Sequence, residues 1–191
     1  MEKANVVIVG AGIGGVRAAQ ELAEKRNVHV TLLDRNNYQL FPPLLYQVST
    51  ATLATGEIAY PVREFFRSCR NVDFRLGEVT GVDVKAREVV TEHGRVPYDY
   101  LVLAAGSTTN FFGNEEVARH AFPMKAMEEA LAIRNQLICC LELAEQETDA
   151  AQGAADVCLR RWRADRRRGG GRYLGAHLSV HAQGLSSPRF L

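Results

Sequence analysis

The chain has 191 residues, of which 47% are hydrophobic and 24% charged, and its formal net charge is +1. These values are typical of a globular protein with a buried core and exclude a fibrous or fully disordered chain. No apolar run is long enough to span a bilayer, and the four cysteines form no CxxC pair. We therefore expect no signal peptide and a cytoplasmic, reducing environment. The nearly neutral total gives no electrostatic reason to expect nucleic acid as a partner.

The near-neutral total conceals two parts of opposite charge. Residues 1–152 carry 15 Lys and Arg against 20 Asp and Glu, whereas residues 153–191 carry 8 Arg against 2 Asp. The second part is rich in Arg, Gly and Ala, and it keeps neither a helical nor a strand period. We therefore expect residues 153–191 to form a disordered C-terminal tail.

The chain begins with the pattern of a strand, a turn, a helix and a second strand. Residues 5–9 are a short run rich in β-branched residues, which predicts a buried parallel strand. Residues 16–25 consist mostly of good helix formers, and residues 28–33 predict the second strand. This order is a βαβ unit of ordinary size, and it indicates an α/β fold with a Rossmann-like domain.

A glycine-rich turn joins the first strand to the helix, which is the context that a dinucleotide-binding motif requires. We expect Gly10 to permit the tight turn, Gly12 to let a pyrophosphate approach the backbone, and Gly15 to let the helix pack near the strand. The phosphates would accept hydrogen bonds from free N–H groups at the start of the helix. The predicted binding residues of the turn are Gly10, Ala11, Gly12, Ile13, Gly14 and Gly15.

Two charged residues follow the second predicted strand. Asp34 ends that strand, and its carboxylate can accept hydrogen bonds from a ribose diol while its charge disfavours a 2′-phosphate. Arg35 comes next and would favour that phosphate, so the two neighbours do not distinguish cleanly between a ribose with a free 2′-hydroxyl and one with a 2′-phosphate. Together with the turn, Asp34 and Arg35 predict a site for the ADP half of FAD or of NAD.

Later in the chain the hydrophobic period changes to two. Residues 72–76, 78–84 and 88–91 alternate as half-buried strands, which predicts a three-stranded antiparallel insert. Residues 101–106 form a further apolar strand that ends at a glycine, and residues 127–146 predict a long amphipathic helix.

This order of elements resembles the FAD domain of the flavoproteins that carry two dinucleotide-binding domains. In that family a glycine in the position of Gly106 lies beside the FAD phosphates and the ribityl chain, within a motif in which Ala105 here replaces the usual Thr. A residue in the position of Val79 makes a backbone contact to adenine. The resemblance therefore adds Ala105, Gly106 and Val79 to the expected FAD site.

Two further segments resemble the type II NADH dehydrogenases, which are single-subunit NADH:quinone oxidoreductases. Residues 34–48 read DRNNYQLFPPLLYQV, residues 56–63 read GEIAYPVR, and the likeness covers residues 4 to about 150. It implies that the backbone at Pro43 and Leu44 lies near the isoalloxazine ring. No cysteine pair occurs in this early region, which excludes electron transfer to a thiol as in enzymes similar to glutathione reductase.

The resemblance implies an FAD-dependent oxidoreductase that takes electrons from NADH and passes them to a membrane quinone. Because the flavin supplies the chemistry, we name no catalytic side chain, and we expect no metal. The resemblance also implies peripheral association with the inner face of a membrane for full-length members, and it leaves homodimerisation open. Two alternatives remain, namely another flavoprotein reductase of the same superfamily and a non-enzymatic FAD-binding fragment with a basic tail.

The expected domain organisation has three parts. Residues 1–125 form the N-terminal part of the FAD domain, residues 126–152 a connecting helix, and residues 153–191 the tail. No second GxGxxG motif occurs, so we expect the NADH-binding domain to be missing and the activity of this chain to be weak or absent.

The tail stands where the family has its second glycine motif, and its codons suggest an origin. Trp162 has a single codon, TGG, so the reading frame displaced by one base encodes glycine there. In that frame residues 153–169 are compatible with ALLTFVFVGGGPTGVE, a strand followed by a glycine-rich turn. We hypothesise a frameshift near residues 152–153, either in the gene itself or in its sequencing, and the alternative is a genuine basic tail.

Overall fold

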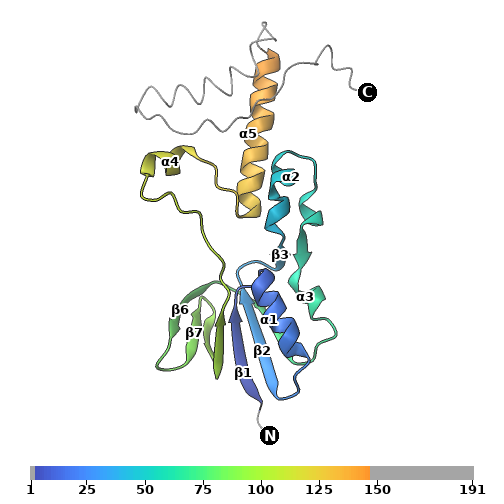
Figure 1. Cartoon of the computed structure of the whole chain (residues 1–191), viewed down its shortest axis with the longest axis vertical. Coiled ribbons are helices and arrows are strands. Elements are labelled where there is room, and N and C mark those ends of the chain that lie inside the picture. Colours follow the sequence, from blue (N-terminus) through green and yellow to red (C-terminus); the bar gives the residue numbers. More distant parts are fainter. Residues whose placement is uncertain (1–2, 147–191) are drawn as a thin grey trace. The chain divides into compact units, whose positions relative to one another are not determined.

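The chain divides into two units, Met1–Ile138 and Cys139–Leu191. The computed structural model of the protein describes residues 3–146 (Figure 1). The predicted tail, residues 153–191, lies outside the described residues, so its predicted disorder stays a prediction. The fold that positions the site belongs to the first unit.

A four-stranded parallel sheet forms the centre of the first unit. In spatial order its strands are β5 (Val72–Leu76), β2 (Val28–Asp34), β1 (Ala4–Val9) and β9 (Tyr100–Leu103). Strand β1 pairs with a neighbour on each side, so that Ile8 lies opposite both Leu32 and Val102. Helix α1 (Ile13–Ala23) connects β1 with β2 and completes the predicted βαβ unit (Figure 1).

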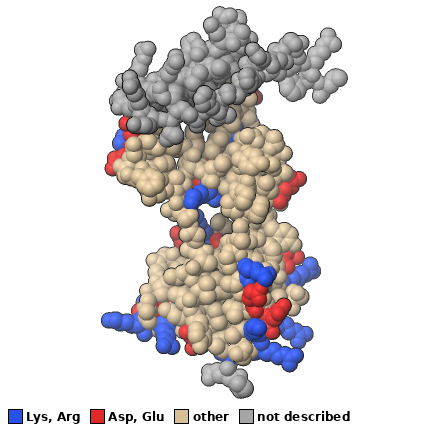
Figure 2. Space-filling view, viewed as in Figure 1, with Lys and Arg blue, Asp and Glu red and all other residues tan. Residues whose placement is uncertain are grey.

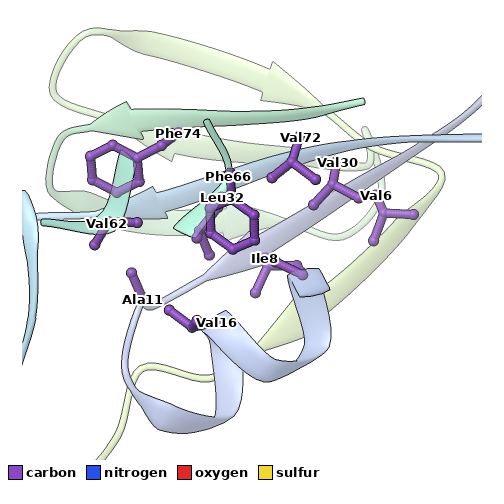
Figure 3. Packing of buried hydrophobic residues seen from close by; sticks show 11 residues of the cluster. Val6, Ile8, Ala11, Val16, Val30, Leu32, Val62, Phe66, Val72 and Phe74 are labelled. Atoms are coloured by element: carbon purple, nitrogen blue, oxygen red, sulfur yellow. The ribbon is translucent and has the colours of Figure 1, made fainter. Parts of the chain in front are cut away.

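Both faces of this sheet are covered, which explains why its central strands are continuous apolar runs. On one face Ile8 belongs to the same buried cluster as Val16 of α1, and Figure 3 shows these side chains between sheet and helix. On the other face Val7 packs in a second cluster with Val89. Successive residues of β1 therefore point into two different cores.

The second core lies beneath a three-stranded antiparallel sheet. Its strands are β6 (Val79–Asp83), β7 (Glu88–Thr91) and β8 (Gly94–Pro97). The prediction of an antiparallel insert is confirmed, but the assignment of residues 72–76 to it is wrong, because β5 pairs in parallel with β2. The alternation in β5 arises because Val72 and Phe74 face the core while Asp73 and Arg75 are exposed.

Strand β9 is an edge of the parallel sheet among the described residues, and it is shorter than predicted. Its side chains Tyr100 and Leu103 are 64% and 67% exposed. Residues 104–106, which we expect to continue the strand, lie beyond its end and border the site described below, although the N–H of Ala104 still donates to the carbonyl oxygen of Val9 at 2.7 Å.

The remaining elements are short, except for one helix. Helix α5 (Met127–Gln146) has the predicted bounds, and Met127 packs with Leu45 and Ile58 in a third cluster. The other elements are β3 (Tyr38–Leu40), η1 (Pro42–Leu44), α2 (Leu45–Ser49), η2 (Thr55–Glu57), β4 (Ala59–Pro61), α3 (Val62–Phe65) and α4 (Glu115–His120). Within residues 3–146 no helix combines the length and apolarity needed to cross a membrane.

One buried amide connects the end of α1 to the starts of β2 and β5. The side-chain nitrogen of Asn71 donates to the carbonyl oxygens of Leu22, Lys25 and Val28 at 3.1, 3.0 and 3.4 Å. The carbonyl oxygen of Asn71 in turn accepts a hydrogen bond from the N–H of Val30 at 2.8 Å. The turn pairs the carbonyl oxygen of Leu22 with the N–H of Lys25 at 3.0 Å, and Asn71 adds a donor to it and supplies one to Lys25 and Val28.

We expect Asn71→Ala to lower the free energy of unfolding by about 1–3 kcal/mol, because it removes the hydrogen bonds of a buried amide and takes from the carbonyl oxygen of Lys25 the donor that Asn71 supplies. Urea unfolding followed by circular dichroism measures the change. The matched control is Asn27→Ala, at an exposed position in the same turn, which should stay within about 0.5 kcal/mol of the unaltered chain. Equal effects of the two variants would contradict this role of Asn71.

Candidate functional site

A cleft of about 800 Å³ opens at the carboxyl ends of β1 and β9. From β1 the chain continues through α1 to β2 on one side, whereas β9, the neighbour on the other side, comes much later in the sequence. Open α/β sheets bind ligands at such a change of direction. A hollow with basic side chains beside it is visible in the middle of the surface in Figure 2.

Most of the predicted site residues line this cleft, and four do not. Gly15 is buried behind it, Pro43 and Leu44 lie in η1, and half-buried Val79 begins β6 and packs in the second core. The predicted residues that the structure brings together are Gly10, Ala11, Gly12, Ile13, Gly14, Asp34, Arg35, Ala105 and Gly106. Residues without a predicted role also line it, among them Tyr38, Leu40, Ser107, Lys125 and Glu128.

The glycines of the turn differ in the space that surrounds them. Gly10 has a φ of +101°, and a Cβ there would overlap the carbonyl group of Ala104. A Cβ on Gly15 would overlap the carbonyl oxygen of Gly10, so the helix lies directly against the turn. By contrast, a Cβ on Gly12 or Gly14 would meet no protein atom within 4 Å. The first two glycines serve the fold, and the other two keep the backbone accessible from the cleft.

The start of α1 presents hydrogen-bond donors to the cleft. Gly12 is its N-cap residue, no side chain caps it, and no acidic side chain lies in its first turn. The first N–H groups of a helix have no partner within the helix, and the helix dipole makes this end positive. Since Gly12, Ile13 and Gly14 line the cleft, this end of α1 suits an anionic group such as a diphosphate.

Asp34 holds the turn in place as well as facing the cleft. Its Oδ2 accepts a hydrogen bond from the N–H of Ala11 at 2.6 Å, and its Oδ1 accepts one from the N–H of Asn36 at 2.8 Å. Each carboxylate oxygen can accept more than one hydrogen bond, so both can still accept a ribose hydroxyl. The sequence motif predicts that Asp34 faces the cleft, but it does not predict the hydrogen bonds by which Asp34 holds the turn.

Tyr38 and Glu128 meet in the cleft from distant parts of the chain. The hydroxyl of Tyr38 donates to Oε1 of Glu128 at 3.4 Å. Burial raises the pKa of Tyr38, and the negative charge of Glu128 raises it further. The phenol therefore stays protonated at neutral pH and remains a donor.

The described residues of the cleft fit a dinucleotide. They combine a backbone that a diphosphate can approach at Gly12 and Gly14, unpaired donors at a helix start, and a carboxylate at the end of the second strand. Among residues 3–146 no group of three or more His, Cys, Asp and Glu side chains could hold a metal ion.

Comparison with known proteins agrees with this geometry. A family model described as pyridine nucleotide-disulphide oxidoreductase matches residues 4–140. The chain belongs to this family. Its resemblance to the type II NADH:quinone oxidoreductases is also confirmed: it is 41% identical over 153 residues to Ndh of Mycobacterium tuberculosis, a protein of that name. The match takes in 78% of this chain and 33% of that protein, so the chain spans about a third of its relative's length.

Solved structures of related oxidoreductases are similar to this chain in fold. NDH2 from Plasmodium falciparum superposes with a TM-score of 0.67 at 26% identity, covering 77% of this chain and 31% of the other. The sulfide:quinone oxidoreductase of Aquifex aeolicus superposes with a TM-score of 0.62, also at 26% identity, covering 75% and 33%. The α/β fold with a Rossmann-like core is therefore confirmed.

The two classes of glycine should respond oppositely to a methyl group. Gly15→Ala should lower the free energy of unfolding by at least about 2 kcal/mol, because the methyl group forces α1 away from Gly10. Gly14→Ala should be neutral or stabilise by up to about 1 kcal/mol, because alanine is the better helix former and the position is open. Urea unfolding of both variants checks this, and similar losses at both positions would contradict it.

Proposed function

We propose that this chain is the FAD-binding part of an FAD-dependent NADH:quinone oxidoreductase. The observation that supports it best is the cleft at the end of β1, where the glycine turn, the start of α1 and Asp34 provide what a dinucleotide requires. The 41% identity to a type II NADH:quinone oxidoreductase favours this activity over others of the family.

In this proposal each part of the cleft holds one part of FAD. The N–H groups of Gly12, Ile13 and Gly14 hold the diphosphate, and Asp34 accepts hydrogen bonds from the adenosine ribose. When bound, FAD supplies the chemistry that accepts a hydride from NADH and passes electrons to a quinone. The contribution of Pro43, Leu44 and Val79, which do not line the cleft, stays a prediction from the family resemblance.

NADH, quinone, peripheral membrane association and homodimerisation belong to the proposal for the protein as a whole. The present chain spans about a third of the relative's length, and in this proposal that third contains the flavin site alone. The structural likeness to a sulfide:quinone oxidoreductase favours a second candidate function, that of a related flavoprotein reductase with another electron donor. A screen of electron donors and acceptors with protein extended to the relatives' length would separate the two.

FAD binding tests the proposal directly. Titration of the purified chain with FAD, followed by the quenching of flavin fluorescence, should show saturable binding at one site. Gly12→Ala should weaken it by about tenfold or more without loss of stability, because the methyl group occupies the place where the diphosphate approaches the backbone. The control is Gly81→Ala, a position in β6 that is equally open and does not line the cleft. Absence of binding by the unaltered chain would refute the proposal.

We also propose that residues 153–191 result from a frameshift. If the frameshift arose in sequencing, DNA sequencing across codons 150–155 should reveal a one-base difference that restores the strand and the GGGPTG turn; if it lies in the gene, close relatives should encode that strand and turn in place of the tail. In the first case the mass of the protein expressed from its native gene should exceed 21.1 kDa. An intact mass of 21.1 kDa, together with an unchanged gene and the same tail in close relatives, would contradict the hypothesis.

A further inference from the structure

The acidic and the basic side chains that line the cleft differ in their hydrogen bonds and ion pairs. The two carboxylates, Asp34 and Glu128, accept hydrogen bonds from protein donors, as described above. The two cations, Arg35 and Lys125, form no ion pair within the described part of the chain. The cleft therefore has its negative charges engaged and its positive charges available, which favours an anionic ligand.

Lys125 contacts a hydroxyl that also faces the cleft. Its Nζ lies 2.7 Å from Oγ of Ser107, which directly follows Gly106. An ammonium group only donates, so the serine oxygen must accept, and the hydroxyl hydrogen is left to donate elsewhere. Lys125 retains two further N–H groups for the same purpose. The pair thus presents only donors to the cleft.

The backbone that carries Lys125 is fixed before the ligand arrives. The N–H groups of Lys125 and Ala126 both donate to Oε2 of Glu129, at 2.6 and 3.0 Å. This carboxylate caps the start of α5 and holds the preceding turn. With the backbone held in this way and Nζ bonded to Ser107, less freedom is lost when the ammonium group binds a ligand.

We propose that Lys125 and Ser107 form a second anion-binding point of the cleft, which binds a phosphate oxygen of the FAD diphosphate. This inference rests on the proposed FAD function. The diphosphate is the anionic part of FAD, and the start of α1 meets it with backbone donors and a partial charge alone. The pair adds a full positive charge and side-chain donors. Lys125 contributes both directly and by orienting Ser107.

The test compares FAD and ADP binding at low and high salt for the unaltered chain and for Lys125→Met, Ser107→Ala and the double variant. Lys125→Met should weaken both ligands by about 10- to 100-fold, the loss expected for a charge-assisted hydrogen bond, and should reduce the salt dependence of binding. Ser107→Ala should cost less, and the double variant should be little worse than Lys125→Met, because the two residues act as a unit.

Two controls separate binding from folding. Lys85→Met removes an exposed lysine between β6 and β7, outside the cleft, and should change neither affinity nor its salt dependence. Lys125→Arg keeps the charge and should retain most of the affinity. The urea midpoint of Lys125→Met should stay close to that of the unaltered chain, because this side chain is exposed, forms no ion pair among the described residues and loses only a hydrogen bond to the exposed Ser107.

The outcomes distinguish the two proposals. If the unaltered chain binds FAD and Lys125→Met binds it equally well, the inference is wrong while the FAD site stands. A loss for FAD but not for ADP, or a loss with unchanged salt dependence, would also overturn the assignment to the diphosphate. If the unaltered chain binds no FAD, both proposals fail.

Discussion

The close approach of Gly15 to the carbonyl oxygen of Gly10 is the constraint on which the site depends. Because no side chain separates them, α1 begins directly against the end of β1, and its free N–H groups face the cleft. The positive φ of Gly10 turns the chain into this position, and the bond from Ala11 to Asp34 ties the turn to β2. The fold and the candidate site thus share the same few backbone atoms. Folding therefore already orders the backbone that a ligand would contact, and little further conformational entropy is lost on binding.

The sequence predicts those parts of the fold whose pattern is local. Strand β1 is recognisable because both of its faces are buried, and α5 because its apolar residues follow a helical period. The pattern misleads at β5, where one exposed and one buried side produce the alternation of an antiparallel strand although the partner is parallel β2. Pairing is a non-local property, and a strand of three residues such as β3 is too short to show any period.

In the candidate site, too, the residues of a local motif are predictable and those that meet only in the folded chain are not. That the glycine turn and Asp34 line one cleft is predictable, because they belong to a motif with a fixed spacing along the chain. Ser107 and Lys125, 18 residues apart, and Tyr38 and Glu128, 90 residues apart, belong to no spaced motif and meet only in the folded chain. The local signals are that Ser107 directly follows Gly106, and that Lys125 directly precedes the predicted connecting helix and lies within the stretch of family likeness. The structural role of Asp34 was equally hidden, since both of its bonds go to backbone groups.

The exposed side of β9 has a consequence for work with the isolated chain. Among the described residues nothing pairs with its outer edge, where Tyr100 and Leu103 are largely exposed. Such an edge is a template on which a strand of another molecule can add, and the flanking apolar side chains strengthen that addition. Self-association that increases with protein concentration is therefore the expected behaviour in solution. Dilute samples keep the molecules apart and leave the cleft at the end of β1 accessible to its ligand.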